Sequence, residues 1–137
     1  MSRLPTAVAC ALCAAALAAC NSPENERGSG AGERGREVAR TVESLERAIA
    51  RRDFRAVCRD LFTRAVREQA GGRACPSMLR RTSRGLRRPR IRIRSVSLRG
   101  ERAVAEVTTL AAGQTPARDT IQLVREGGRW RVAALGG

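Results

Sequence analysis

Hydrophobic residues recur at helical spacing around residue 40. Val38, Val42, Leu45 and Ile49 fall at positions i, i+4, i+7 and i+11, which is the spacing of one face of an amphipathic helix. We therefore expect a first helix that begins near residue 36 and ends near Arg52.

A second helical pattern follows without a gap. Asp53 suits an N-cap, and the apolar residues after it repeat the i, i+3, i+4 spacing over three turns. These residues are Phe54, Val57, Cys58, Leu61, Phe62, Ala65 and Val66. Gly71 and Gly72 are expected to end this helix, and Pro76 suits the first turn of a short third helix that runs to about Arg84.

From residue 90 the apolar period becomes two, which is typical of β-strands. Ile91 and Ile93 share one parity, whereas Val96 and Leu98 have the opposite one. A shift of one residue turns every following side chain to the other face of a strand. We therefore expect a β-bulge or a bend near Arg94 or Ser95 that keeps one face of the strand buried.

Three more strands are predicted at 102–111, 120–125 and 129–135, and the last two are joined by a tight hairpin at the sequence EGG. The residues of each of two sets are expected to share a face of the sheet: Ile121 with Leu123, and Trp130 with Val132 and Ala134. Helices followed by an antiparallel sheet predict an α+β fold, in which two to three N-terminal helices pack on a curved four-stranded sheet.

The first 20 residues have the pattern of a signal peptide. One positive charge at Arg3 precedes an apolar run from Ala7 to Ala19. The run is too short for a transmembrane helix, which needs about 20 apolar residues. We expect residues 1–19 to be removed as a signal peptide.

The segment LAAC, Leu17 to Cys20, resembles the bacterial lipobox, whose pattern is Leu, small, small, Cys. The resemblance implies that Cys20 receives a diacylglycerol and becomes the mature N-terminus, anchored at the extracytoplasmic face of the cell membrane. Two alternatives stay open at this point. One is an ordinary signal peptide with a chance cysteine, and the other is a chain that is never exported.

Residues 20–35 are polar and rich in glycine, and they show no apolar periodicity. This composition predicts a flexible tether. A coil of this length would hold the following domain, residues 36–137, at an r.m.s. distance of roughly 20 Å from its anchor.

The cysteines also fit an exported protein. Cys10 and Cys13 would leave with the signal peptide and Cys20 would carry lipid, so Cys58 and Cys75 remain in the domain. An even pair in an oxidising compartment is a disulfide candidate, and two buried free thiols are the alternative. A metal site is not expected, because the chain has no histidine to complete one.

All 27 basic residues are arginines, and the formal net charge is +14. Residues 36–94 hold 18 arginines and 6 acids, a net +12, whereas residues 95–137 hold 6 arginines and 4 acids, a net +2. Eight arginines fall between residues 80 and 94 without an acid among them. This arginine strip consists of Arg80, Arg81, Arg84, Arg87, Arg88, Arg90, Arg92 and Arg94.

We expect the arginine strip to contact anionic lipid or cell-wall polymer. The alternative is a solvated face enriched in arginine by codon usage. Nucleic acid is not expected as a partner, because export removes the usual target. The chain also has only three aromatic residues on which bases could stack.

Residues 36–135 resemble the nuclear transport factor 2-like (SnoaL-like) superfamily, and in particular the small exported lipoproteins that carry this domain. The resemblance rests on the sequence RRDF between the first two helices, on the pair Cys58 and Cys75, and on the ending LVREGGRWRVAAL with its tryptophan. It implies a cone of helices packed against a curved antiparallel sheet.

Enzymes that resemble this fold use His and Asp or Tyr inside the cone, and this chain has neither His nor Tyr. Among the carboxylates, Asp53 is interpreted as a helix cap and Asp60 as a solvated charge, while Glu106 and Asp119 could face a cavity. We expect no catalytic residue, cofactor or metal.

These features together predict a lipid-anchored extracytoplasmic binding or scaffold module of the bacterial cell envelope. Two alternatives remain. One is an exported enzyme of the same fold that acts on a small ligand, and the other is a basic nucleic-acid-binding protein, if the signal is false.

Overall fold

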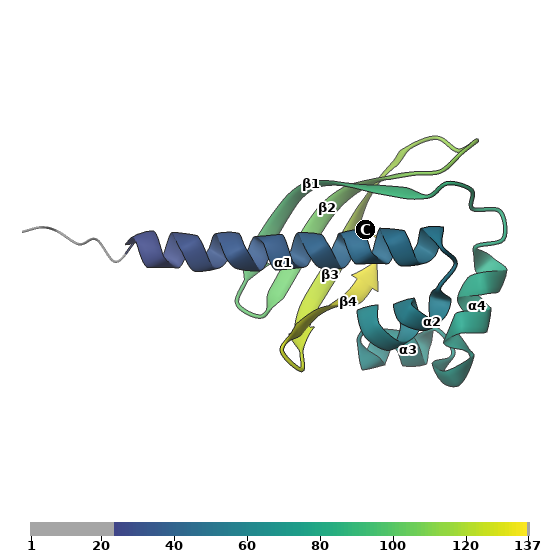
Figure 1. Cartoon of the computed structure of the whole chain (residues 1–137), viewed down its shortest axis with the longest axis horizontal. Helices are drawn as coiled ribbons and strands as arrows, with labels where there is room; N and C mark the ends of the chain where they lie inside the picture. Colours follow the sequence, from purple (N-terminus) through teal and green to yellow (C-terminus); the bar gives the residue numbers. More distant parts are fainter. Residues whose placement is uncertain (1–23, 137) are drawn as a thin grey trace, which may run out of the picture.

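The structure is a computed structural model that describes residues 24–136, with side chains from residue 31 onward. Helical segments come first and four strands follow (Figure 1). The elements are α1 (Glu24–Ala50), α2 (Phe54–Ala56), the π-helical turn η1 (Val57–Leu61), α3 (Arg64–Gln69), the 3₁₀ turn η2 (Gly72–Ala74), α4 (Cys75–Thr82), β1 (Arg90–Arg99), β2 (Arg102–Leu110), β3 (Ala117–Glu126) and β4 (Arg129–Leu135).

The four strands form one antiparallel sheet in the order β1-β2-β3-β4, and the sheet is open. Gly127 and Gly128, both with positive φ (59° and 75°), make the two-residue turn between β3 and β4, as a type I′ hairpin requires. Helices packed against an antiparallel sheet confirm the predicted α+β class.

The bulge predicted from the change of parity in β1 is present. Ile93 pairs with Val107 and Ser95 pairs with Glu106, so that Arg94 is the extra residue between them. The apolar residues on both sides of the bulge, Ile91, Ile93, Val96 and Leu98, all pack against the core. The bulge is therefore what allows a strand with two parities to keep one apolar face.

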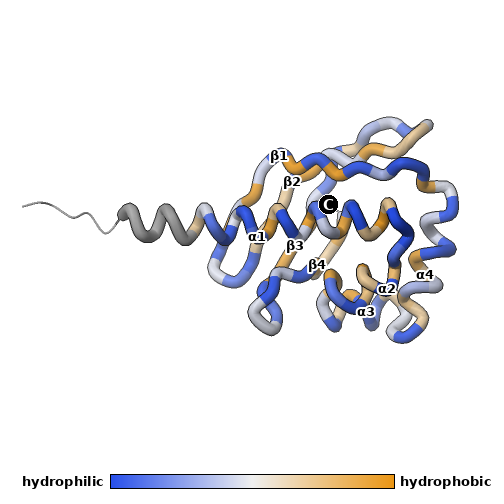
Figure 2. The backbone as a smooth tube through the Cα atoms, in the orientation of Figure 1, coloured by the Kyte–Doolittle hydropathy of each residue, from blue (hydrophilic) through white to orange (hydrophobic). Residues whose placement is uncertain are grey.

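The core lies between α1 and one face of the sheet. Figure 2 shows hydrophobic and hydrophilic residues alternating along α1, and Val38, Val42 and Leu45 on that helix are at most 1% exposed. The buried residues that face them from the sheet are Ala103, Ala105, Val107, Ile121, Leu123, Trp130 and Val132. The Trp130 side chain also donates a hydrogen bond from Nε1 to Glu37 Oε2 on α1, at 3.2 Å.

The single second helix predicted from the sequence is wrong, because the structure divides it into α2, η1 and α3. The chain leaves the helix at Phe62, whose backbone is extended, and starts α3 after Thr63, whose side chain caps Val66 N. The cause lies far away in the sequence: Phe62 forms a parallel bridge with Val132, and Thr63 N–H donates to the Val132 carbonyl at 2.9 Å. Local spacing alone cannot reveal this contact with β4.

The expected flexible tether also differs from the structure, because α1 begins at Glu24 and includes residues 24–35. Residues 20–23 lie outside the described part of the chain. Glycine occurs four times in residues 24–35, at positions 28, 30, 32 and 35, and each glycine disfavours a helix by about 1 kcal/mol relative to alanine, so local composition does not account for these turns. Gly35 is close to β1, since a Cβ added there would lie 4.0 Å from Leu98 Cδ1. Figure 1 shows the N-terminal turns of α1 extending beyond the sheet.

One residue of the last strand faces the opposite way from the prediction. Val132 pairs with buried Leu123, but a register shift follows and Ala134 pairs with exposed Gln122. Ala134 therefore does not share the buried face of Trp130 and Val132.

Candidate functional site

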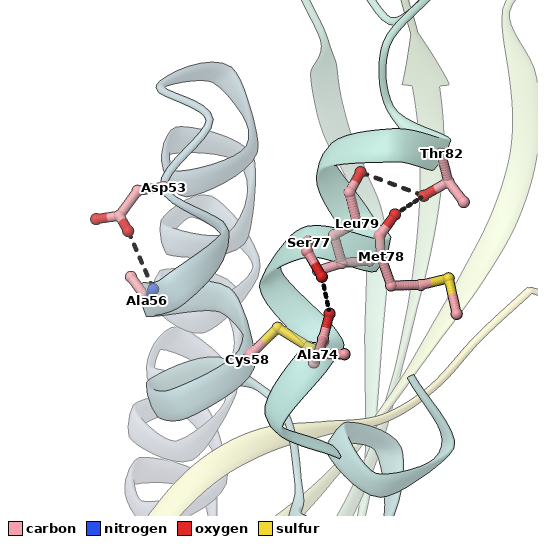
Figure 3. Close-up of a disulfide and its surroundings, with 9 residues drawn as sticks. Asp53, Ala56, Cys58, Ala74, Ser77, Met78, Leu79 and Thr82 are labelled. Atoms are coloured by element: carbon pink, nitrogen blue, oxygen red, sulfur yellow. Dashed lines mark hydrogen bonds between the residues drawn. A yellow bond between two sulfur atoms is a disulfide. The ribbon is translucent and has the colours of Figure 1, made fainter. Parts of the chain in front are cut away.

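The predicted disulfide is present between Cys58 in η1 and Cys75 at the start of α4, with 6.2 Å between the two Cα atoms. Both cysteines are buried, at 3% and 0% exposure. Figure 3 shows the bond joining the helical turn after Asp53 to α4. The bond links α4 covalently to η1, and α2 also packs against α4.

The arginine strip runs from the last turns of α4, through the connection formed by residues 83–89, into the first half of β1. All eight of its side chains are exposed. Because β1 is an edge strand of the sheet, the three strip residues in β1, Arg90, Arg92 and Arg94, lie along a free edge of the sheet.

Glu46 on α1 fixes the point where the strip enters the sheet. Its Oε2 accepts a hydrogen bond from the Ile91 backbone N–H at 2.6 Å, and its Oε1 lies 3.5 Å from Arg90 Nε. Arg90 therefore has a carboxylate partner. Among the side chains of residues 31–136, no acid lies within 4.0 Å of the other seven guanidinium groups of the strip.

The backbone of the connection between α4 and β1 is held by hydrogen bonds that leave its arginine side chains free. The Arg87 carbonyl accepts from Ala112 N–H at 2.8 Å. The Leu86 carbonyl accepts from the Arg52 guanidinium at 3.4 Å. Arg88 has φ 48° in the turn before Pro89. The strip therefore presents several cations from an anchored loop.

The strip lies toward the C-terminal end of α1. Glu46, four residues before the end of the helix at Ala50, contacts the start of β1, whereas Gly35 lies beside Leu98 at its end. From Glu24 to Glu46 the helix rises by roughly 33 Å. The strip and the beginning of α1 therefore lie at opposite ends of the molecule (Figure 1).

Replacing Glu46 by alanine is expected to lower the free energy of unfolding by about 1–3 kcal/mol, because the Ile91 N–H loses a charged acceptor. Glu46→Gln keeps an acceptor and should cost less. Urea unfolding of both variants measures the difference. The control is Glu43→Ala on the same helix, where an exposed pair with Arg47 (3.8 Å) should contribute less than about 0.5 kcal/mol. Equal losses from Glu46→Ala and Glu43→Ala would contradict the role given to Glu46.

The four carboxylates singled out in the sequence are distributed over the molecule. Asp53 is the predicted helix cap, since its Oδ1 accepts from Ala56 N at 3.1 Å. Asp60 forms two hydrogen bonds with the Arg59 guanidinium, both 2.9 Å, and these lower the pKa of Asp60 below its usual value. The adjacent Arg131 donates to the Asp60 carbonyl at 2.9 Å.

Glu106 and Asp119 both line a surface hollow of about 360 Å³ on the sheet, which we call the sheet hollow. Its lining residues are Arg94, Glu106, Val107, Arg118, Asp119 and Thr120. Both carboxylates accept a hydrogen bond within the chain, Glu106 from the Ser95 hydroxyl at 3.0 Å and Asp119 from Thr120 N–H at 2.8 Å. Each therefore already has a polar partner.

A second group of arginines, not predicted from the sequence, gathers beside the disulfide. Arg55, Arg59, Arg67 and Arg73 come from four short helical segments and line one hollow with Cys58, Gly72 and Pro76. The signal in the sequence was the position of three of these arginines close to the two cysteines: Arg55 and Arg59 flank Cys58, and Arg73 precedes Cys75 by two residues. The disulfide and the packing of α2 against α4 bring these two stretches together.

No helix in residues 24–136 combines the length and the apolar character that crossing a membrane requires. Within the same residues, no three His, Cys, Asp or Glu side chains gather as a metal site would need. Comparisons of the chain with protein-family models, with curated proteins and with solved structures find no match. Membership of the nuclear transport factor 2-like superfamily stays a prediction from the sequence.

Proposed function

We propose that this chain is a lipid-anchored extracytoplasmic module of the bacterial cell envelope, which binds an anionic partner and does not catalyse a reaction. The observation that carries the proposal is the segment LAAC after a short apolar run, which resembles the lipobox and makes Cys20 the anchor. The helices, the sheet and the exposed arginines then form the part of the protein that meets the partner.

The disulfide supports export. Disulfides persist in oxidising compartments and are rare in the bacterial cytosol. The bond between Cys58 and Cys75 joins two of the three cysteines that follow residue 19, and the third is Cys20. The placement of the cysteines thus agrees with one lipid-bearing thiol and one structural pair.

We also propose that the N-terminal part of α1 serves as a spacer of defined length between Cys20 and the rest of the domain. Cys20 stands four residues before Glu24, where α1 begins. The part of α1 before Val38, the first buried residue of the helix, rises by roughly 20 Å. This rise is similar to the distance expected for a coil, but a helix holds its direction whereas a coil does not.

The position of the arginine strip favours a polymer over the anchoring membrane as its anionic partner. The strip lies toward the end of α1 opposite to Glu24, the residue of the helix that is nearest to Cys20 in the sequence, and the rise from Glu24 to Glu46 is roughly 33 Å. Attraction to an anionic lipid surface falls off within a Debye length of about 8 Å at physiological salt. We therefore propose that the strip contacts an anionic cell-wall polymer on the far side of the domain.

The lipid anchor is tested with the variant Cys20→Ser. The unaltered protein is expected almost entirely in the membrane fraction after cell lysis, and the variant is expected to lose this association, because the thiol that carries the diacylglycerol is gone. Fractionation followed by immunoblotting at high salt measures both. The control is Cys10→Ser, which keeps the lipobox. Full retention of Cys20→Ser in the membrane would contradict a lipid anchor at this residue.

The arginine strip is tested with inorganic polyphosphate as a soluble anionic polymer. The quadruple variant of Arg87, Arg88, Arg92 and Arg94 to glutamine should weaken binding by about tenfold or more, because each arginine near an anionic surface contributes up to about 1 kcal/mol. Binding by both proteins should weaken as salt is raised. Fluorescence anisotropy of labelled polyphosphate measures the affinity of the full chain in non-ionic detergent.

The matched control changes four exposed arginines outside the strip, which also have no acid within 4.0 Å among the side chains of residues 31–136. They are Arg40, Arg99, Arg102 and Arg129. Equal losses from both quadruple variants would mean that only net charge matters. Strip-dependent binding of the Cys20→Ser protein to phosphatidylglycerol vesicles, without binding to polyphosphate, would instead assign the strip to lipid.

A further inference from the structure

The four arginines beside the disulfide surround a hollow of about 250 Å³. We call it the disulfide hollow. Each arginine is supplied by a different segment: Arg55 by α2, Arg59 by η1, Arg67 by α3 and Arg73 by η2. None of these residues belongs to the arginine strip. Convergence of four separate segments on one concave site is more specific than a run of exposed charges along one strand.

Three of these guanidinium groups are available to a ligand. Arg59 is held by Asp60 through two hydrogen bonds of 2.9 Å. Among the side chains of residues 31–136, no carboxylate lies within 4.0 Å of the guanidinium groups of Arg55, Arg67 and Arg73. The site therefore holds a positive charge that the ion pairs of the described chain leave uncompensated.

The neighbouring helix end and the rim add to the electrostatics of this site. Pro76, in the first turn of α4, lines the hollow, and the N-terminal end of a helix carries a partial positive charge. Glu68 lies at the rim: a Cβ added to Gly72 would be 3.0 Å from Glu68 Oε2. The negative charge of Glu68 at the rim of the hollow is expected to repel a bound anion.

We propose that the disulfide hollow binds the phosphate group of a small ligand or of a lipid headgroup. Arginine guanidinium groups match phosphate oxygens as bidentate donors, and such charge-assisted hydrogen bonds are about twice as strong as neutral ones. A site for one phosphate group is also consistent with a hollow of about 250 Å³. The proposal does not depend on lipidation of Cys20 or on the arginine strip.

The disulfide holds the two halves of this site together. Arg55 and Arg59 belong to the chain around Cys58, whereas Arg73 precedes Cys75 on the other side of the glycine turn. Reduction of the bond would remove the covalent link between η1 and α4 and loosen the common geometry of the four arginines. We therefore expect phosphate binding to weaken in the reduced protein while the arginine strip keeps its charge.

The binding experiment is a titration of the full, ¹⁵N-labelled chain in non-ionic detergent with inorganic phosphate, followed by NMR. Backbone amides of residues 72–75 and arginine Nε–H signals should shift saturably with phosphate, and chloride at equal ionic strength should not reproduce these shifts. The triple variant Arg55→Gln, Arg67→Gln, Arg73→Gln should raise the Kd for phosphate by about tenfold or more. Its amide spectrum shows whether it is folded.

Two further variants make the result decisive. The triple variant Arg40→Gln, Arg102→Gln, Arg129→Gln removes the same charge elsewhere and should change the Kd less than about threefold. Glu68→Gln removes the opposing acid and should strengthen binding. The proposal is overturned if both triple variants weaken binding equally, if chloride gives the same shifts, or if Glu68→Gln leaves the Kd unchanged.

The source of the phosphate group is distinguished with glycerol 3-phosphate and with vesicles that contain phosphatidic acid. Competition by glycerol 3-phosphate against inorganic phosphate would assign the site to a soluble phosphate ester. Binding to the vesicles without such competition, and its loss in the Arg55, Arg67, Arg73 variant, would assign it to a lipid headgroup. Binding of neither probe at this site would overturn the proposal.

Discussion

Removing the disulfide by the double substitution Cys58→Ala and Cys75→Ala is expected to lower the free energy of unfolding by about 3 kcal/mol. The bond closes a loop with a sequence separation of 17 residues, and a cross-link of this length restricts the unfolded chain by about that amount. A domain of about 100 residues has only about 5–15 kcal/mol of stability, so a large part would be lost. Urea unfolding followed by circular dichroism measures the change.

The control for this prediction is a reducing agent. Reduction should destabilise the unaltered protein by a similar amount and leave the double variant unchanged, because the variant has no bond to break. Unfolding midpoints that agree between the oxidised protein and the double variant would show that the disulfide does not stabilise this fold.

Replacing Trp130 by alanine is expected to cost about 3–5 kcal/mol, the range for removal of a large aromatic side chain from a core. Trp130 is 5% exposed and lies on β4 between the sheet and α1. Its indole also donates to Glu37 at 3.2 Å, so the substitution removes both packing and a hydrogen bond. Trp130→Phe keeps much of the volume and should cost less than the alanine variant.

The matched control is Leu135→Ala on the same strand, because Leu135 is 52% exposed. This change should cost less than about 0.5 kcal/mol. Thermal unfolding followed by circular dichroism compares the three variants without relying on tryptophan fluorescence. Similar midpoints for Trp130→Ala and Leu135→Ala would contradict the position of Trp130 in the core.

Features that depend on neighbouring residues were predictable from the sequence. The spacing of Val38, Val42 and Leu45 predicted the buried face of α1, and the reversal of parity between Ile93 and Val96 predicted the bulge. In both cases the pattern follows directly from helix or strand geometry, because each side chain must reach the same core.

Features that depend on distant partners were not predictable in this way. The break after Phe62 follows from a hydrogen bond between Thr63 N–H and the Val132 carbonyl, and the turn of Ala134 to the outer face follows from a second register shift. The residues before Val38 have no apolar period and include four glycines, which disfavour a helix, yet α1 begins at Glu24.

Of the two candidate binding surfaces, one was predictable from the sequence and the other was not. The arginine strip was visible because its members are close together in the sequence. The disulfide hollow was not, because Arg55, Arg59, Arg67 and Arg73 come from four separate segments that only the tertiary structure brings to one site. Counting charges along a sequence therefore identifies a charged surface that comes from one segment of the chain. A charged surface that several distant segments build together is identified only from the tertiary structure.

The central claim, a module anchored through Cys20, is tested most directly by the intact mass of the protein extracted from membranes of the cells that make it. We predict a chain that lacks residues 1–19 and carries the added mass of a diacylglycerol on Cys20, with two hydrogen atoms fewer for the bond between Cys58 and Cys75. A soluble full-length chain, or a membrane-extracted chain that begins at another residue and carries no lipid, would contradict the account.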